Sequence, residues 1–363
     1  MNAVFLHITI FTALACGLAL FMIIADFFIG DYGQAVITVN NSKKLEVEAG
    51  STLLSVLKGQ KIFIPSACGG RGSCGLCKVK IISGAGDYLA TELPWISADE
   101  KKSGIRLSCQ VKVRRNLEIE IPESLFNIHE YRARVESIRN LTYDIKEIKI
   151  SLPEEEQINF KAGQFMQIET PVYELTAQPV YRAYSIASSP GQKNSVEFEI
   201  RLVPGGICTT YIHKHLKIGD TVTLNGPYGD FFVRPGQKKI IFIAGGSGMA
   251  PIKSMLADMV LQKNTRQAVY FFGARTQKDL FLTDEIRTYE NRLAFRFIPA
   301  LSSPEPGWKG ESGLITEVVD RYIQNGPEYE AYLCGSPGMI NACVSVLVKK
   351  GVSEKEIYFD KFG

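Results

Sequence analysis

The stretch Cys68-Gly-Gly-Arg-Gly-Ser-Cys74-Gly-Leu-Cys77 places three cysteines in one short loop, separated by five and by two residues. A fourth cysteine, Cys109, follows farther along the chain. Thiolates with this spacing resemble the plant-type [2Fe–2S] pattern, here with one extra residue in the first gap. The alternative is a zinc site, which usually has two paired C-x2-C units, whereas this set has one. The four cysteines therefore predict an iron–sulfur cluster.

The loop is rich in glycine, which suits this chemistry. A loop that wraps a cluster must adopt positive φ angles and must turn several backbone N–H groups toward the sulfurs. The glycines in the loop are Gly69, Gly70, Gly72 and Gly75. No disulfide framework is expected, because the other four cysteines are scattered. They are Cys16, Cys208, Cys334 and Cys343.

Short alternating runs flank the cysteine loop on both sides. Two β-prone runs meet at Asn40-Asn41, which predicts a hairpin, and the leucine spacing after Thr52 predicts a short helix that stops at Gly59. The strands expected around the loop are residues 35–39, 44–48, 78–82 and 116–121. The first soluble domain is therefore expected at about residues 34–126.

The rest of the chain predicts two further domains. Residues 130–235 contain β-rich runs that glycine and proline interrupt, which predicts an antiparallel β-barrel. Residues 238–363 alternate strand-like and helix-like runs, which predicts a parallel sheet with helices on both faces. The helices expected there include residues 251–261, 279–289 and 339–349.

The N-terminal run Ala3 to Ala25 has 23 residues and no Asp, Glu, Lys or Arg. As a helix it would cover roughly 35 Å, enough to span a bilayer. The alternative is a signal peptide, but the run lacks a basic segment before it, exceeds a typical signal core and shows no clear cleavage site. The run predicts an uncleaved transmembrane anchor.

The overall composition excludes some classes of protein. The 363 residues include 41 Lys+Arg and 38 Asp+Glu, for a net charge of +3, and 45% are hydrophobic. Neither a disordered chain nor a polycation that binds nucleic acid fits these values. No nucleic-acid partner is therefore expected.

The tetrapeptide Arg182-Ala-Tyr-Ser185 ends a β-prone stretch. A flavin dinucleotide needs a cation for its pyrophosphate, an aromatic side chain for its ring and a small hydrogen-bonding side chain near its reactive nitrogen. Arg182, Tyr184 and Ser185 offer these three groups. The alternative is that Tyr184 is an ordinary core residue of the barrel. Downstream, the segment from Gly206 to Thr210 could offer N–H groups at a helix N-terminus to phosphate.

An apolar strand from Ile240 runs into a glycine turn and then a predicted helix at Pro251. Glycines in such a turn let a pyrophosphate approach the backbone at the positive end of the helix dipole. The turn lacks the G-x-G-x-x-G fingerprint, and the alternative is a purely structural turn. Cys334 ends a later predicted strand, where doubly wound sheets place ligands, and its alternative is an inert buried thiol.

Taken in order, the apolar run, the cysteine loop, R-x-Y-S, G-x-x-T, G-G-x-G-x-A-P and C-G-x-P resemble the ferredoxin-reductase superfamily with an N-terminal [2Fe–2S] domain. Within it the sequence is similar to the NADH-oxidising F subunits of sodium-translocating NADH:quinone oxidoreductases. The likeness extends to the terminal segment from Asp360 to Gly363. The segment before Arg182 is shorter than is usual there, and Thr209 and Ser336 stand where Ser and Pro are usual.

The resemblance implies a multidomain fold with a transmembrane helix, a β-grasp ferredoxin domain of the α+β class, an antiparallel β-barrel that binds FAD and an α/β domain with a parallel sheet that binds NAD. It implies FAD and a [2Fe–2S] cluster as cofactors, NADH as substrate, and other membrane subunits of a quinone-reducing complex as partners. Electrons would pass from NADH to FAD, then singly through the cluster to a membrane acceptor. The implied place is the inner membrane of a bacterium.

Residue by residue, the resemblance implies that Arg182 holds the FAD pyrophosphate, Tyr184 packs on the isoalloxazine and Ser185 approaches N5. Cys334 would lie beside the nicotinamide and act in catalysis with Ser185. Phe362 would cover the flavin face, the alternative being a frayed chain end. The other implied contacts with phosphates or NADH belong to Gly206, Thr209, Thr210, Gly245, Gly246, Gly248, Met249 and Gly335.

A flavin between NADH and cluster also follows from stoichiometry, because hydride carries two electrons and the cluster accepts one. NADH and cluster assembly are cytoplasmic, so the soluble domains are expected in the cytoplasm and the N-terminus outside. Two alternatives remain: a reductase component that feeds a monooxygenase or dioxygenase, and a non-catalytic membrane electron-transfer subunit. The apolar run counts against the first, and the intact glycine turn counts against the second.

Overall fold

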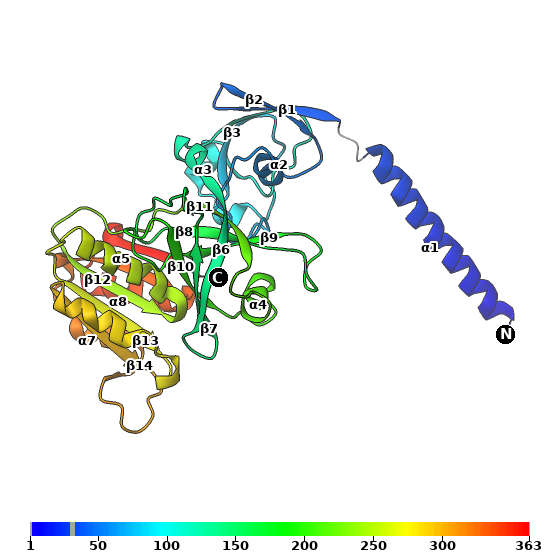
Figure 1. The fold of residues 1–363 in the computed structure, drawn as a ribbon. Coiled ribbons are helices and arrows are strands. Elements are labelled where there is room, and N and C mark those ends of the chain that lie inside the picture. The colour runs from blue at the N-terminus through cyan, green and yellow to red at the C-terminus, as the bar shows by residue number, and fades with distance from the viewer. Residues whose placement is uncertain (1, 30–32, 363) are drawn as a thin grey trace. The chain divides into compact units, whose positions relative to one another are not determined.

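The computed structural model describes residues 2–29 and 33–362, and the side chains of residues 7, 10–22, 33–123, 125, 126 and 128–362. The chain divides into two compact units, Met1–Asn127 and Ile128–Gly363. Figure 1 colours the chain along its length from blue to red. The first unit holds the cysteine loop, and the second holds the predicted flavin and nicotinamide segments.

The first element, α1 (Asn2–Ile29), makes the whole predicted anchor at residues 3–25 helical. The side chains of residues 3–6, 8–9 and 23–25 lie outside the described part. Among the described residues, no helix is both long enough and apolar enough to cross a membrane.

A five-stranded mixed sheet forms the core of the first unit, in the order β2-β1-β5-β3-β4. Asn40 and Asn41 turn the chain between β1 and β2 with φ angles of 50° and 55°, a left-handed conformation that asparagine tolerates, so the predicted hairpin is confirmed. The predicted helix is also confirmed: Thr52 caps α2 by accepting from the Ser55 N–H. The elements of this unit are β1 (Gln34–Val39), β2 (Lys43–Glu48), α2 (Leu53–Gly59), β3 (Lys78–Ser83), η1 (Leu93–Trp95), α3 (Ala98–Lys102), β4 (Ile105–Leu107), β5 (Leu117–Glu120) and η2 (Glu123–Asn127).

A buried ion pair fastens the segment before η1 to β4. Arg106 donates from Nε and Nη2 to the two carboxylate oxygens of Glu92, at 2.9 and 2.6 Å, and both side chains are at most 5% exposed. Arg106 also donates to the backbone oxygens of Gly86 and Asp87. Burial alone would raise the pKa of Glu92, but Arg106 and two backbone N–H groups hold that pKa below its usual value. The pair therefore fixes the strand that leads into Cys109.

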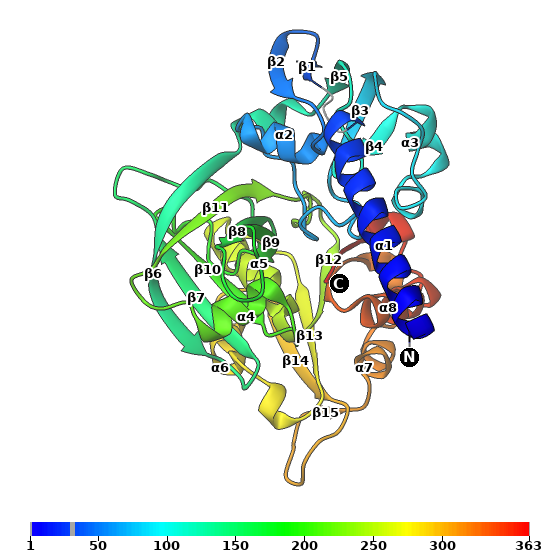
Figure 2. The ribbon, with the colours of Figure 1, turned by 90° about the vertical axis from the view of Figure 1, so that its right-hand side faces the viewer.

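Six antiparallel strands form the predicted barrel, in the order β10-β7-β6-β11-β8-β9. The sheet closes on itself because Ile186, directly after β9, bridges to Phe198 of β10, and the Ala187 N–H donates to the Glu197 oxygen at 2.8 Å. The barrel strands β6, β7 and β11 lie side by side in Figure 2. The elements are β6 (His129–Asn140), β7 (Ile145–Ser151), β8 (Phe165–Thr170), β9 (Val180–Ser185), β10 (Ser195–Arg201), α4 (Ile207–Lys214) and β11 (Thr221–Tyr228).

A six-stranded parallel sheet follows, in the order β15-β14-β13-β12-β16-β17, as the alternating pattern predicts. Alternate side chains of β12 enter two different cores. Ile240 and Phe242 pack with α5 and α6, whereas Ile241 and Ile243 pack with α7 and α8. The helices therefore cover both faces of the sheet.

The elements of this part, in chain order, are β12 (Lys239–Gly245), η3 (Gly246–Gly248), α5 (Met249–Leu261), β13 (Ala268–Ala274), η4 (Gln277–Asp279), α6 (Thr283–Arg287), η5 (Thr288–Asn291), β14 (Phe295–Leu301), β15 (Glu311–Ser312), α7 (Ile315–Tyr322), η6 (Gly326–Glu328), β16 (Tyr329–Gly335), α8 (Pro337–Lys349), η7 (Glu354–Glu356) and β17 (Ile357–Lys361). The single helix expected over residues 279–289 is wrong. Thr276 and Asp279 form the capping box of a separate turn, η4, and Leu282 then adopts a φ of 52°. The helical pattern is divided at that point, and only α6 is α-helical.

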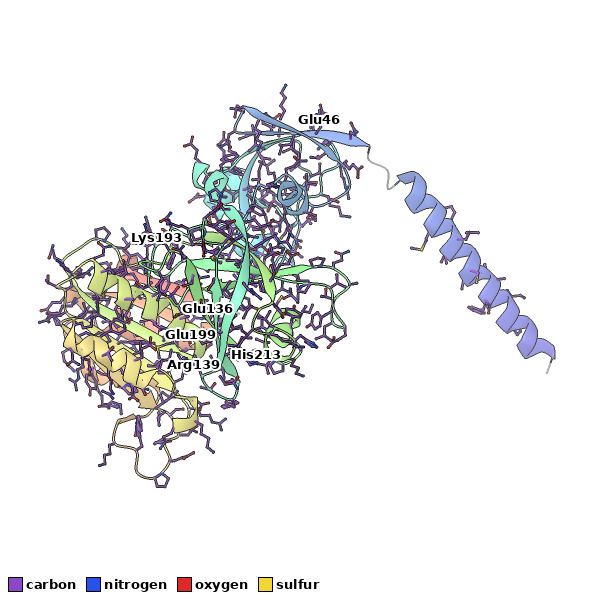
Figure 3. All side chains as sticks on the ribbon, viewed as in Figure 1. Glu46, Glu136, Arg139, Lys193, Glu199 and His213 are labelled. Carbon is purple, nitrogen blue, oxygen red and sulfur yellow. The ribbon has the colours of Figure 1, made fainter. Side chains whose placement is uncertain are left out.

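A buried lysine joins the barrel to the parallel sheet. Lys253 of α5 is 6% exposed, and its Nζ lies 3.2 to 3.8 Å from four carboxylates. These carboxylates belong to Glu147, Glu197, Glu199 and Glu285. Glu199, labelled in Figure 3, is 4% exposed, and neither of its carboxylate oxygens has a hydrogen-bond partner in the described part of the chain. Burial raises the pKa of Glu199 to about 8, although Lys253 opposes this.

We expect Glu199→Gln to flatten the pH dependence of stability. The folded pKa of Glu199, about 8, lies above its ordinary value of 4.5, so its contribution to stability is complete below pH 4.5 and is lost as the pH rises through 8. Between about pH 5 and pH 9, the wild type should lose about 4 kcal/mol more unfolding free energy than the variant. Urea titrations at both pH values measure the difference, with the exposed Glu154→Gln as control. Parallel profiles for the wild type and Glu199→Gln would contradict it.

Candidate functional site

The four cysteines of the predicted cluster come together as two pairs in the first unit. The Cys68 thiol contacts Cys74, and the Cys77 thiol contacts Cys109. Among the described residues, no three His, Cys, Asp or Glu side chains surround a position for a single metal ion. Two pairs of thiols suit a two-iron cluster, in which each iron takes two of the four cysteine ligands.

The loop turns backbone N–H groups onto these sulfurs, as its glycine content predicts. The Cys68 sulfur receives hydrogen bonds from Arg71 and Ser73, and the Cys109 sulfur receives one from Gly72. The conformation depends on positive φ angles of 66°, 89°, 73° and 69° at Gly69, Gly70, Gly72 and Gly75. The donor set and these N–H groups therefore fit a thiolate-bound cluster.

Two of the four thiols are also prepared for deprotonation. A hydrogen bond from Cys74 lowers the pKa of Cys68 to about 4, and a hydrogen bond from Cys77 lowers the pKa of Cys109 to about 7. The same contacts raise the pKa of Cys74 and of Cys77. Within each pair one thiol thus loses its proton more readily than the other, and a bound metal would displace any proton that remains.

The predicted flavin residues lie on β9, which pairs with β8. In this register Arg182 faces Ile168, and Ser185 faces Phe165. Arg182 is half-buried, and its Nη1 donates to the neighbouring Tyr181 oxygen at 2.7 Å. The remaining guanidinium donors of Arg182 can serve a pyrophosphate, because arginine carries five of them.

The hydroxyl of Tyr184 is a candidate contact for a ligand. It is buried, and it has no hydrogen-bond partner in the described part of the chain. Burial raises the pKa of Tyr184 well above its usual value, so the group remains a neutral donor and acceptor. A buried hydroxyl normally finds a partner, so the residues present fit a polar ligand beside this strand. The ring also packs against the barrel core, which agrees in part with the alternative role of Tyr184 as a core residue.

The segment predicted to meet phosphates opens α4. Gly206 is the N-cap of this helix, which has no side-chain cap, so the helix N-terminus can accept an anion. The Thr209 hydroxyl is hydrogen-bonded to the backbone of Val203, at 3.1 Å from its N–H. The Thr209 hydroxyl thus closes the turn before the helix. The neighbouring Thr210 is buried, with 9% of its surface exposed.

The glycine turn after β12 permits close backbone approaches. A Cβ at Gly248 would lie 2.3 Å from the Cys334 backbone oxygen, and one at Gly245 would lie 3.0 Å from the Met339 sulfur. Gly246 has a φ of 57°, which glycine adopts without strain. Met249 follows the turn and is fully buried under the Tyr270 hydroxyl, at 3.2 Å from its sulfur. The packing of the turn against β16 and α8 thus depends on its glycines.

The two predicted catalytic residues both lie near Asp360, toward the end of the parallel sheet. Cys334 is the last residue but one of β16, is fully buried, and stands opposite Asp360 of β17. Ser185 of the barrel forms a hydrogen bond with the Asp360 carboxylate, while burial raises the pKa of Asp360 to about 6. Burial and the Asp360 charge raise the pKa of Cys334 well above its usual value, so it remains a thiol. Ser185 and Cys334 thus converge on one carboxylate.

Phe362 lies next to this convergence and is ordered by two contacts. Its N–H donates to the Gly335 oxygen at 2.9 Å, and its half-buried ring packs against the core shared by β12 and α5. Gly335 itself has a φ of 146°. The residue therefore has a defined place at the edge of the sheet.

Two residues of this region, Asp360 and Arg201, belong to no short motif that would assign them a role. No local sequence pattern marks Asp360, and the Ser185 residue that it contacts lies far away in the sequence. Only its position in the terminal segment from Asp360 to Gly363 could have indicated a role. Arg201 of β10 places Nη1 3.3 Å from where a Cβ of Gly246 would stand, and its Nε donates to Asp144 at 2.6 Å. A cation there faces the turn predicted to hold a pyrophosphate.

Family models match the chain in three consecutive segments. Residues 37–114 match the 2Fe-2S iron-sulfur cluster binding domain, residues 132–233 the oxidoreductase FAD-binding domain, and residues 242–345 the oxidoreductase NAD-binding domain.

Curated relatives match the whole chain. The F subunit of the Na(+)-translocating NADH-quinone reductase of Neisseria gonorrhoeae is 36% identical over 403 aligned positions, covering 99% of both chains. The protein of the same name from Methylococcus capsulatus is 33% identical and covers 100% of both. The alignments exceed the 363 residues of this chain because the relatives carry residues that it lacks.

Solved structures are similar over most of the chain. The Amycolatopsis cytochrome P450 reductase GcoB has a TM-score of 0.73 and 26% identity, covering 90% of this chain and 98% of that one. The ferredoxin reductase in carbazole 1,9a-dioxygenase has a TM-score of 0.70 and 28% identity, covering 91% and 99%.

Proposed function

Because this chain belongs to the family of F subunits of Na(+)-translocating NADH-quinone reductases, we propose which of its residues hold the cofactors and pass the electrons. It is an NADH:quinone oxidoreductase subunit that works with other subunits of a quinone-reducing complex. Electrons pass from NADH through FAD to a [2Fe–2S] cluster. When bound, FAD accepts electrons in pairs and releases them singly, and the cluster carries one at a time.

In this proposal Ser185 and Cys334, which both lie near Asp360, would hold the flavin and the nicotinamide in position for hydride transfer. That convergence is the observation that supports the assignment most strongly, because one residue comes from the barrel and the other from the parallel sheet. Ser185 fixes the flavin side of the contact, and the buried Cys334 thiol excludes water on the nicotinamide side. The pKa of Asp360 is about 6, which is close to neutral pH. This carboxyl group can therefore both hold and release a proton near Ser185.

The remaining residues bind and orient the cofactors. Arg182 and the N-terminus of α4, at Gly206 and Thr210, neutralise the FAD pyrophosphate, and Tyr184 supports the flavin ring. The turn made by Gly245, Gly246, Gly248 and Met249 holds NADH, with Gly335 at its edge and Arg201 as an additional cation. Cys68 with Cys74, and Cys77 with Cys109, bind the two irons of the cluster.

We also propose that α1 is a single-pass anchor in the inner membrane of a bacterium. The uncharged run from Ala3 to Ala25 supports this, since it is long enough to span the hydrocarbon core. NADH is a cytoplasmic substrate, so the domains after residue 33 belong in the cytoplasm.

An anaerobic titration tests the electron path. The purified protein, loaded with FAD and iron, is titrated with NADH while the absorbance of the oxidised flavin and the electron paramagnetic resonance (EPR) signal of the reduced cluster are recorded. We expect loss of flavin absorbance together with a cluster signal. Loaded protein whose flavin is not reduced by excess NADH would overturn the proposal.

Arg182→Ala should weaken FAD binding by about 1.5–3 kcal/mol, the range for a hydrogen bond to a charged group. The cluster should be retained, because its ligands lie in the other unit. Equilibrium dialysis followed by flavin fluorescence measures the affinity. The exposed Arg132→Ala, on the same barrel, is the matched control. Unchanged flavin occupancy in Arg182→Ala would remove the residue from the site.

Phe362→Ala should bind NAD(H) more tightly and pass more electrons to oxygen. The reason is that a ring over the flavin must move before nicotinamide can reach it, and the same ring shields the reduced flavin. Binding titrations and oxygen consumption measure the two effects. Phe359→Ala is the control, because Phe359 lies on the same strand and is 46% exposed. If both quantities match the wild type, Phe362 has only a structural role.

A further inference from the structure

Two polar side chains that the cofactor assignments leave unused lie beside the cluster cysteines. Gln110 directly follows Cys109, and its Nε2 lies 3.4 Å from the Cys109 sulfur, within the range of an N–H···S hydrogen bond. Ser108 directly precedes Cys109, is fully buried, and lies close enough to Cys77 to lower the pKa of that thiol. The Ser108 hydroxyl has no hydrogen-bond partner in the described part of the chain, so it is free to donate to a nearby sulfur.

The amide of Gln110 is held in one orientation from two sides. The Thr91 hydroxyl donates to Gln110 Oε1 at 2.8 Å, which leaves the NH2 end directed at Cys109. On the other side the amide packs against the loop, where a Cβ at Gly72 would lie 2.8 Å from Nε2. A Cβ at Gly72 would therefore push the amide from its position.

The buried ion pair of Glu92 and Arg106 holds this arrangement in place. Thr91 immediately precedes Glu92, whose carboxylate is bound by Arg106 at 2.6 Å. Arg106 in turn belongs to β4, which runs into Ser108. The hydroxyl that orients Gln110 and the strand that carries Ser108 are therefore fixed relative to each other.

We propose that Gln110 and Ser108 tune the reduction potential of the cluster by donating hydrogen bonds to Cys109 and Cys77. The inference rests on the proposed cluster ligands and goes beyond them. Reduction adds negative charge to the cluster and its sulfurs, and a donor aimed at a sulfur stabilises the charged form more than the oxidised form. Both donors thus raise the potential, and Thr91 acts on it through Gln110 as a positioning residue.

An EPR-monitored redox titration of the full chain, loaded with iron and FAD, tests this. Ser108→Ala and Gln110→Leu should each lower the ratio of reduced to oxidised cluster at a fixed potential by about tenfold, which is 59 mV for a one-electron couple. Thr91→Val should give a smaller decrease, and Gln110→Glu, which adds a negative charge, a larger one. Gln60→Leu, at an exposed position in the same unit, should leave the ratio unchanged.

Iron and sulfide analysis separates the outcomes. Full cluster content with a wild-type potential in both Ser108→Ala and Gln110→Leu overturns the inference. If Gln110→Leu loses its cluster, the potentials of Ser108→Ala and Thr91→Val test the inference instead. Loss of the cluster in all three variants also overturns the inference, because the residues would then be structural. Failure of the wild-type protein to bind a cluster through the four cysteines would instead refute the proposed function.

Discussion

Each of the substitutions Cys68→Ser, Cys74→Ser, Cys77→Ser and Cys109→Ser is expected to abolish the [2Fe–2S] absorption and EPR spectra. A serine hydroxyl is a poor replacement for a thiolate, and the thiols form two pairs, so losing one member leaves an iron with a single protein ligand. FAD binding should survive, because its predicted residues lie in the other unit. NADH oxidation by a two-electron dye should therefore continue while quinone reduction stops.

The control for this series is Cys16→Ser, which alters an exposed cysteine outside the loop and should leave the cluster spectrum intact. Iron content and visible circular dichroism are recorded on each purified variant. A loop variant with full iron content and an unchanged spectrum would remove that cysteine from the ligand set.

The second large effect concerns the buried pair of the first unit. Glu92→Gln or Arg106→Met should each reduce the unfolding free energy of that unit by about 3–5 kcal/mol, because the remaining partner is left buried without its counter-charge. The combined variant Glu92→Met with Arg106→Met should lose less than the sum of the two single losses. Urea unfolding followed through the visible circular dichroism of the cluster measures this unit specifically.

An exposed ion pair in the same sheet provides the matched comparison. Lys80 and Glu120 are 2.7 Å apart, and both side chains are more than 40% exposed. Lys80→Ala should cost at most about 1 kcal/mol, since solvent screens the pair. If Glu92→Gln costs no more than Lys80→Ala, the buried pair is not a major source of stability.

Local pattern was sufficient to predict much of the fold. The hairpin at Asn40-Asn41, the helix after Thr52 and the parallel sheet all depend on neighbouring residues or on simple periodicity, and they are confirmed. The helix over residues 279–289 was wrong because apolar spacing does not register a left-handed residue such as Leu282. The strand order of each sheet was also beyond reach, because pairing partners far apart in sequence leave no local trace.

The residues of the candidate site likewise fall into those that the sequence predicts and those that it does not. Spacing alone grouped the four cysteines, but the contact of Ser185 with Asp360 and the ion pair of Glu92 with Arg106 join residues that no periodicity relates. Such polar contacts depend on tertiary packing. The donor role of Gln110 belongs to the same class, because it requires the side chain of Thr91 to be nearby.

The division into two units has a consequence for biosynthesis. The unit with the cysteine loop precedes the barrel and the parallel sheet in the chain, so it leaves the ribosome first and can fold before the rest is made. Iron insertion can then be complete before any flavin site exists. A newly made molecule would then contain its electron-accepting cluster before it can bind and reduce a flavin. This order limits the time during which a reduced flavin has oxygen as its only acceptor.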